Sequence, residues 1–81
     1  MSIIEYTEFL VKNLVKEPDI VKVELFESDE ESPIIEIIVH PDDMGSLIGK
    51  GGKIITSLRT LIQAYAFINK MPKVKVNVDS F

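Results

Sequence analysis

The stretch Leu47-Ile48-Gly49-Lys50-Gly51-Gly52-Lys53-Ile54-Ile55 decides how the rest of the chain is organised. Three of its four central residues are glycine, and each glycine inside a helix costs about 1 kcal/mol relative to alanine. A loop is therefore expected at 49–52, with helix-forming sequence before and after it. Because glycine has no Cβ, another backbone can approach such a loop closely. The N-terminal N–H groups of the following helix, together with the charges of Lys50 and Lys53, predict a binding site for a phosphate backbone.

The composition indicates one small folded domain. The chain has 81 residues, of which 46% are hydrophobic and 27% charged, and this is enough for a single hydrophobic core. It contains no cysteine, which excludes a disulfide framework, a thiol nucleophile and a cysteine-based metal site. Glu5 and Glu8 stand where a secretory signal would carry basic residues, and no apolar run approaches the roughly 18 residues of a membrane span. We therefore expect a cytoplasmic protein with no membrane partner, metal or cofactor.

The charge is unevenly distributed along the chain. The net charge is −4, but residues 1–43 carry twelve acidic and three basic side chains, whereas residues 44–81 carry one acidic and six basic side chains. The first part therefore has a net charge of −9 and the second a net charge of +5. This asymmetry indicates a basic face on an acidic body, with a chance distribution in a short chain as the alternative.

The N-terminal residues predict a helix that serves as scaffold. Ser2 and Glu5 match a capping box, in which each side chain accepts a hydrogen bond from the backbone N–H of the other residue. Apolar residues then recur at helical spacing as far as Val15. The helix is expected to end near Lys16, because Pro18 disfavours a helical conformation of the residue before it.

Two strands are expected next, at residues 20–27 and 34–39. The first alternates apolar and polar residues, as a half-buried strand does, and the second is apolar on both faces, which indicates a central position in a sheet. The polar loop 27–33 between them is short enough for an antiparallel hairpin. Its four acidic residues suggest a hairpin tip exposed to solvent. The alternative is that they repel misplaced phosphates electrostatically.

Two further helices and a third strand are expected in the C-terminal half. Pro41 and the two aspartates after it open a short helix that ends at the glycines. A long helix follows at about 53–69. The valines of the segment 74–78 alternate with polar residues, which predicts a strand beside the second strand and parallel to it.

The apolar residues of the long helix fall into two stripes. The narrow stripe consists of Ile54, Leu58, Leu61, Tyr65 and Ile68. A flanking stripe consists of Ile55, Ile62 and Ala66, and Phe67 points away from both stripes. We interpret the flanking stripe and Phe67 as surplus apolar surface. The complete order is α-β-β-α-α-β, which predicts a two-layer α+β fold with three helices covering one face of a three-stranded mixed sheet. Residues 1–81 are expected to form one domain without repeats or linkers.

The glycine loop does not match the common nucleotide-binding motifs. Gly45-Ser46-Leu47-Ile48-Gly49-Lys50 has the wrong spacing for a Walker A motif, and a dinucleotide fingerprint would follow a strand instead of a helix. A helix–GxxG–helix arrangement, with Ile48 before the loop and Ile54-Ile55 after it, resembles a KH domain. The element order is similar to the type II variant of that fold. The whole chain, including His40-Pro41-Asp42-Asp43-Met44-Gly45 ahead of the loop, resembles the small bacterial single-KH RNA-binding proteins of the KhpA family.

The resemblance implies a non-catalytic protein that clamps the backbone of single-stranded RNA with its GxxG loop and lays the bases against an apolar groove. The RNA-binding residues that it implies are Ile48, Gly49, Lys50, Gly51, Gly52, Lys53, Ile55 and Arg59. Ile48 and Ile55 are candidates for the groove wall, and a position in the core is the alternative for both. The acidic loop 27–33 would correspond to the family's variable loop, which flanks the groove.

The resemblance also implies a partner and a cellular role. Proteins of this family pair with themselves or with a larger KH-containing protein. They are expected to act as post-transcriptional regulators or RNA chaperones linked to cell envelope growth, division and cell shape.

Other functions compete with RNA binding at this stage. The surplus apolar surface favours a protein-interaction module whose main role is homo- or heterodimerisation. An enzyme is disfavoured, because the chain has no cysteine and its one histidine, His40, stands at a strand end before a proline. A plain helix–helix turn would need one glycine and not three. No aromatic residue lies close to the loop in sequence, which predicts modest and weakly selective RNA binding.

Overall fold

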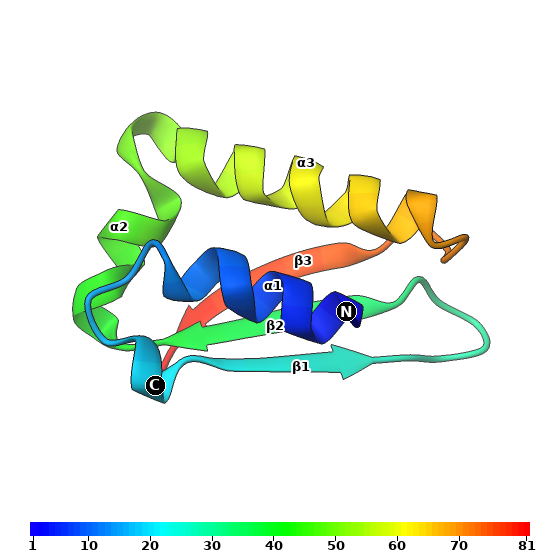
Figure 1. Ribbon diagram of the computed structural model, residues 1–81, viewed down its shortest axis with the longest axis horizontal. Coiled ribbons are helices and arrows are strands. Elements are labelled where there is room, and N and C mark those ends of the chain that lie inside the picture. Colours follow the sequence, from blue (N-terminus) through cyan, green and yellow to red (C-terminus); the bar gives the residue numbers. More distant parts are fainter.

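The computed structural model describes residues 1–81 and has two layers, a three-stranded sheet and a layer of helices on one of its faces (Figure 1). The helices are α1 (Ile3–Lys12), α2 (Met44–Ile48) and α3 (Lys53–Ile68), and the strands are β1 (Lys22–Phe26), β2 (Ile34–Val39) and β3 (Lys75–Ser80). Short 3₁₀ turns occupy Pro18–Ile20, Pro41–Asp43 and Lys50–Gly52. The predicted element order and the α+β class are confirmed.

The sheet has the order β1-β2-β3, so β2 is central, as its apolar sequence predicted. β1 runs antiparallel to β2 with Val23 opposite Ile37, and β3 runs parallel to β2 with Val78 opposite Ile37. Successive side chains of a strand point to opposite faces. One face of β2 therefore carries Ile35, Ile37 and Val39, all fully buried under the helices, while the other face carries no helix.

The core contacts of α3 correct the prediction for its two apolar stripes. Ile55, Ile62 and Ala66 are 7%, 0% and 1% exposed, whereas Leu61 and Ile68 are 47% and 75% exposed. The stripe that was interpreted as surplus surface therefore faces the core, together with Leu58 of the narrow stripe, which is 3% exposed. The two stripes are adjacent on the helix, and its rotation is set by packing against the sheet and α1, which the spacing of the residues does not reveal.

The start of α1 agrees with the sequence, but its end does not. The capping box is present, since Ser2 Oγ accepts from Glu5 N at 3.1 Å and Glu5 Oε1 accepts from Ser2 N at 2.9 Å. The helix ends at Lys12 and is capped by Asn13, so the predicted end near Lys16 is wrong.

A tertiary contact replaces the last expected turn of α1. The backbone N–H groups of Lys16 and Glu17 donate to the two carboxylate oxygens of Asp43, each at 3.0 Å. Asp43 is only 1% exposed and is the one buried charged side chain of the protein. Asp43 lies immediately before α2, so its hydrogen bonds join the segment after α1 to the start of α2, the helix that leads into the glycine loop.

α3 is the longest helix, with 16 residues. No helix in the structure combines the length and the apolar character needed to cross a membrane.

Candidate nucleic-acid interface

The loop between α2 and α3 contains three glycines in conformations that other residues rarely adopt. Gly49 has φ 77° and ψ 171°, Gly51 has φ 66° and ψ 18°, and Gly52 has φ 75° and ψ 16°. Positive φ brings the Cβ of an L-residue into steric conflict with its own backbone. Each of the three positions therefore favours glycine on local grounds, most strongly Gly49, which explains their density in the sequence.

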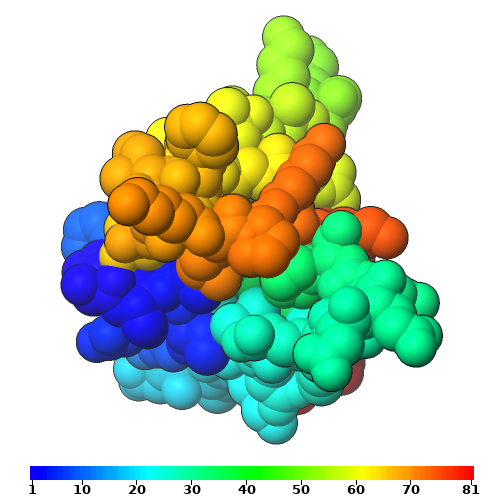
Figure 2. Space-filling view, turned by 90° about the vertical axis from the view of Figure 1, so that its right-hand side faces the viewer, coloured from blue at the N-terminus to red at the C-terminus, as the bar shows by residue number.

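The inner and outer sides of the loop differ. A Cβ on Gly49 would lie 2.6 Å from Ile54 Cγ1, so the loop folds back tightly onto the first turn of α3. No atom lies within 4 Å of the corresponding positions on Gly51 and Gly52. Lys50 and Gly51 are exposed, and the segment around them protrudes from the body of the molecule (Figure 2). The outer side of the loop is thus open to a large ligand.

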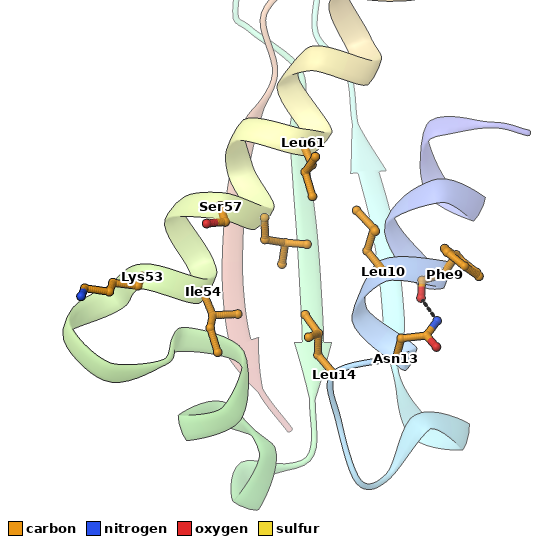
Figure 3. Close-up of a pocket in the computed structure, with 9 residues that line it drawn as sticks. Phe9, Leu10, Asn13, Leu14, Lys53, Ile54, Ser57 and Leu61 are labelled. Carbon is orange, nitrogen blue, oxygen red and sulfur yellow. Dashed lines mark hydrogen bonds between the residues drawn. The ribbon is translucent and has the colours of Figure 1, made fainter.

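The start of α3 adds positive charge and hydrogen-bond donors to the loop. No side chain caps α3 at Gly52, the residue before its first turn, and the N–H of Lys53 donates to the carbonyl of Lys50. The positive end of the helix dipole therefore lies at the loop without a neutralising side chain. Lys53 is exposed, and its side chain points outward from the helix (Figure 3). Lys50, Lys53 and the first turn of α3 therefore form one positively charged end of the molecule.

A groove of about 430 Å³ opens between α1 and α3 beside this loop (Figure 3). It is lined by Phe9, Leu10, Asn13, Leu14, Lys53, Ile54, Ser57, Leu58 and Leu61. Leu10 of α1 and Leu14 in the turn after α1 face Ile54 and Leu61 of α3 across it (Figure 3). The lining is mainly apolar, and its only charged side chain, Lys53, points away from the groove.

The other flank of α3 is polar and lies over the free edge of β3. Arg59 Nε donates to the carbonyl of Val76, and Gln63 Nε2 donates to the carbonyl of Val74, each at 3.1 Å. The guanidinium of Arg59 keeps further N–H donors beyond the one used in this bond. Two different surfaces, one apolar and one polar, therefore lead away from the loop along α3.

The structure brings most of the sequence-predicted residues together. Gly49, Lys50, Gly51, Gly52 and Lys53 form the loop and the start of α3, and Ile48, at the end of α2, is 38% exposed beside them. Arg59 lies on the polar flank of α3.

Ile55 is separated from this group, because it is 7% exposed and belongs to the core. Ile55 therefore has the core position that was its alternative, and its neighbour Ile54, which is 37% exposed, lines the groove between α1 and α3. Sequence reasoning also missed Phe9 and Leu14. Their apolar character was visible in the sequence, but the contact between α1 and α3 was not.

The acidic loop 27–33 lies at the end of the molecule opposite the GxxG loop (Figure 1). It connects the end of β1 to the start of β2, whereas α2 and the GxxG loop follow the end of β2. A ligand that runs along α3 from the GxxG loop would therefore meet the charges of the acidic loop only near the far end of α3.

His40 has a local structural role. Its Nδ1 accepts from the N–H of Asp42 at 3.0 Å and caps the short turn before α2. No group of three or more potential metal ligands occurs in the structure.

The fold and the loop together define a KH domain of type II. A sequence model described as the KhpA/KhpB KH domain matches residues 5–79. The RNA-binding protein KhpA of Clostridium perfringens is 42% identical over 74 residues, which cover 91% of this chain and 96% of that protein. The RNA-binding protein KhpA of Mycobacterium tuberculosis is 43% identical over 60 residues, which cover 74% of each. The chain belongs to the KhpA/KhpB family of KH domains, as the resemblance of its sequence indicated.

A solved structure shares the fold. The crystal structure of Aquifex aeolicus Era bound to GDP·AlF4⁻ superposes with a TM-score of 0.66 at 16% sequence identity. The match covers 98% of this chain and 30% of the Era chain. At this identity the likeness concerns the fold alone.

Proposed function

We propose that this protein is a non-catalytic RNA-binding protein that clamps the backbone of single-stranded RNA in its GxxG loop. The observation that carries the proposal is the open outer side of the loop, where Lys50 and Gly51 project beside the uncapped N-terminus of α3. The names of the curated relatives, which are RNA-binding proteins, support it.

Each residue of the loop has a separate role in this proposal. Gly49 and Gly52 permit the turn, and Gly51 lets a phosphate approach the backbone without a Cβ in the way. Lys50 and Lys53 supply point charges for the phosphates, which KH domains hold over about four nucleotides. Ile48 offers exposed apolar surface at the start of the loop.

The bases are assigned to the polar flank of α3 and not to the apolar groove. Nucleobases carry hydrogen-bonding edges, and burying these edges without partners is unfavourable. The polar flank offers the guanidinium of Arg59, the amide of Gln63 and the free edge of β3. The groove between α1 and α3 offers almost only apolar side chains.

The test is fluorescence anisotropy with short labelled single-stranded RNA at several salt concentrations. The comparison protein is Lys50→Asp/Gly51→Asp, with circular dichroism to establish that it is folded. A few phosphate contacts predict a log–log salt slope of about −0.7 per contact, or roughly −1.5 to −3 in total. The wild type should bind with such a slope and the folded variant should not. Equal binding by both proteins would exclude the loop as the RNA site.

A second function, pairing with another copy of this chain, is favoured by the groove between α1 and α3. Phe9, Leu14 and Leu61 on its walls are 58%, 41% and 47% exposed, and exposed apolar surface of this kind is typical of protein interfaces. A larger KH-containing protein is the alternative partner. Leu61→Asp should keep the mass in solution at that of a monomer over a range of concentrations where the wild type becomes a dimer. An unchanged mass profile would exclude this groove.

The cellular part of the proposal follows from the family resemblance. It is post-transcriptional regulation or RNA chaperoning in the cytoplasm, linked to cell envelope growth, division and cell shape. A deletion strain complemented by the wild type but not by the loop variant would support this role.

A further inference from the structure

Phe67 is an unusual residue for the surface of a small domain. It lies in the last turn of α3, and at 82% it is the most exposed large apolar side chain of the protein. We infer that Phe67 is a stacking platform for a base of the bound RNA, at the end of α3 far from the GxxG loop. This inference rests on the proposed function and extends its RNA footprint.

Helix geometry places Phe67 in line with the polar flank of α3. Arg59, Gln63 and Phe67 are spaced by four residues, so their side chains lie one above the other on one face of the helix. The first two of these side chains are held over β3 by their bonds to its carbonyls. Phe67 continues the same row, and it lies about 21 Å along the helix from Lys53 at the loop.

The surroundings of Phe67 suit a nucleobase. A hollow of about 270 Å³ is lined by Gln63, Phe67, Met71 and Lys73. The turn that forms it is closed by the N–H of Met71, which donates to the carbonyl of Ala66 at 2.9 Å. An aromatic ring and a thioether offer flat and polarisable contacts to a base, while the oxygen of the Gln63 amide remains free to accept a hydrogen bond. Figure 2 views the molecule from this end, where the segment 67–73 lies on the surface.

The charges at this end indicate that a base, and not a phosphate, supplies the contact. The acidic loop 27–33 lies at the same end of the molecule as the turn between α3 and β3 (Figure 1), and the N–H of Lys75 donates to the carbonyl of Pro33 at 2.8 Å. The four acidic side chains of that loop oppose the attraction of Lys70 and Lys73 for a phosphate. Stacking on Phe67 does not depend on that balance.

The test compares two RNA lengths. Labelled oligouridines of about four and about ten nucleotides are titrated into the wild type, Phe67→Ala and Ile68→Ala. Ile68 is a matched control, because it is 75% exposed and adjacent but does not line the hollow. The longer RNA should bind Phe67→Ala about 5- to 10-fold more weakly than the wild type, with an unchanged salt slope. The shorter RNA should bind all three proteins alike, and Phe67→Tyr should restore the affinity for the longer one.

Tryptophan at this position provides an independent readout. The chain has no tryptophan, so Phe67→Trp introduces a single fluorophore at the platform. Its fluorescence should be quenched by the longer RNA and not by the shorter one.

Three results would overturn the inference. The first is that Phe67→Ala binds the longer RNA as tightly as the wild type does. The second is that Phe67→Ala loses the same factor in affinity for the shorter and the longer RNA. The third is a change in the mass of Phe67→Ala in solution without a change in RNA binding, which would assign Phe67 to a protein contact. A wild type that binds neither RNA would refute the proposed function itself, whereas binding that depends on the GxxG loop but not on Phe67 would refute only this inference.

Discussion

Replacing Gly49 by alanine tests the geometry of the loop most directly. At φ 77° and ψ 171° this residue lies in a region that is essentially restricted to glycine, and the strain there is about 1–3 kcal/mol for another residue. The new Cβ would also lie 2.6 Å from Ile54 Cγ1 and 2.9 Å from Ile54 Cβ. Because Ile54 Cβ is fixed by the backbone of α3, rotation of the side chain cannot remove the whole clash.

The expected loss is about 3 kcal/mol of the free energy of unfolding. Overpacking contributes about 1–3 kcal/mol beyond the strain, and the reduced entropy of the unfolded chain offsets about 0.4–1 kcal/mol. Gly51→Ala is the matched control, since it is also at positive φ but has no atom within 4 Å of the new Cβ. Its expected loss is about 1 kcal/mol or less.

Urea unfolding followed by circular dichroism measures both losses, and a double-mutant cycle with Ile54→Ala separates strain from clash. Removing Ile54 Cγ1 and Cδ1 should lower the cost of Gly49→Ala by about 0.5–1 kcal/mol, because only the contact with Cβ remains. Equal losses for Gly49→Ala and Gly51→Ala, together with strict additivity in the cycle, would show that Ile54 does not support the loop.

Three further predictions concern the scaffold. Asp43→Asn should lower the free energy of unfolding by about 2 kcal/mol and accelerate hydrogen exchange of the N–H groups of Lys16 and Glu17, which donate to this carboxylate. Exchange at wild-type rates would contradict the buried contact. Ile62→Ala should destabilise by about 2–5 kcal/mol and Leu61→Ala by much less, and urea unfolding that gave the reverse order would contradict the rotation of α3. The backbone N–H of Ser2, followed by its side chain, lowers the pKa of Glu5, so the stability from this carboxylate is present above its ordinary pKa and is lost as the pH falls through the lowered value. Ser2→Ala keeps the backbone N–H and removes only the side-chain contribution, so it should raise the pKa of Glu5 part of the way towards its ordinary value in an NMR titration; an unchanged pKa would contradict the contribution of the Ser2 side chain.

Features that depend on a few neighbouring residues could be predicted from the sequence. The capping box of Ser2 and Glu5 is a local pair of hydrogen bonds, and the structure contains it. The three loop glycines have positive φ for local steric reasons, so their density alone located the loop. The central position of β2 was predicted from its apolar sequence and is confirmed by its pairing at both edges, although helices cover only one of its faces.

Features that depend on contacts between distant segments could not be predicted in this way. The end of α1 is set by Asp43, which lies 27 residues beyond Lys16 in the chain. The assignment of Ile55 to the core and of Ile54 to the groove depends on how α3 is rotated between the sheet and α1. Neither contact leaves a signal in the spacing of nearby residues.

The sequence by itself therefore determined the loop, the order of the elements and the family, because glycine backbone preferences and hydrophobic periodicity act over a few residues. Only the tertiary structure decided which surfaces of α3 are free. It separates an apolar groove beside α1 from a polar flank that runs along β3 to Phe67. Two adjacent stripes on one helix are equally apolar in sequence, and the packing of the other elements against that helix selects the one that is buried.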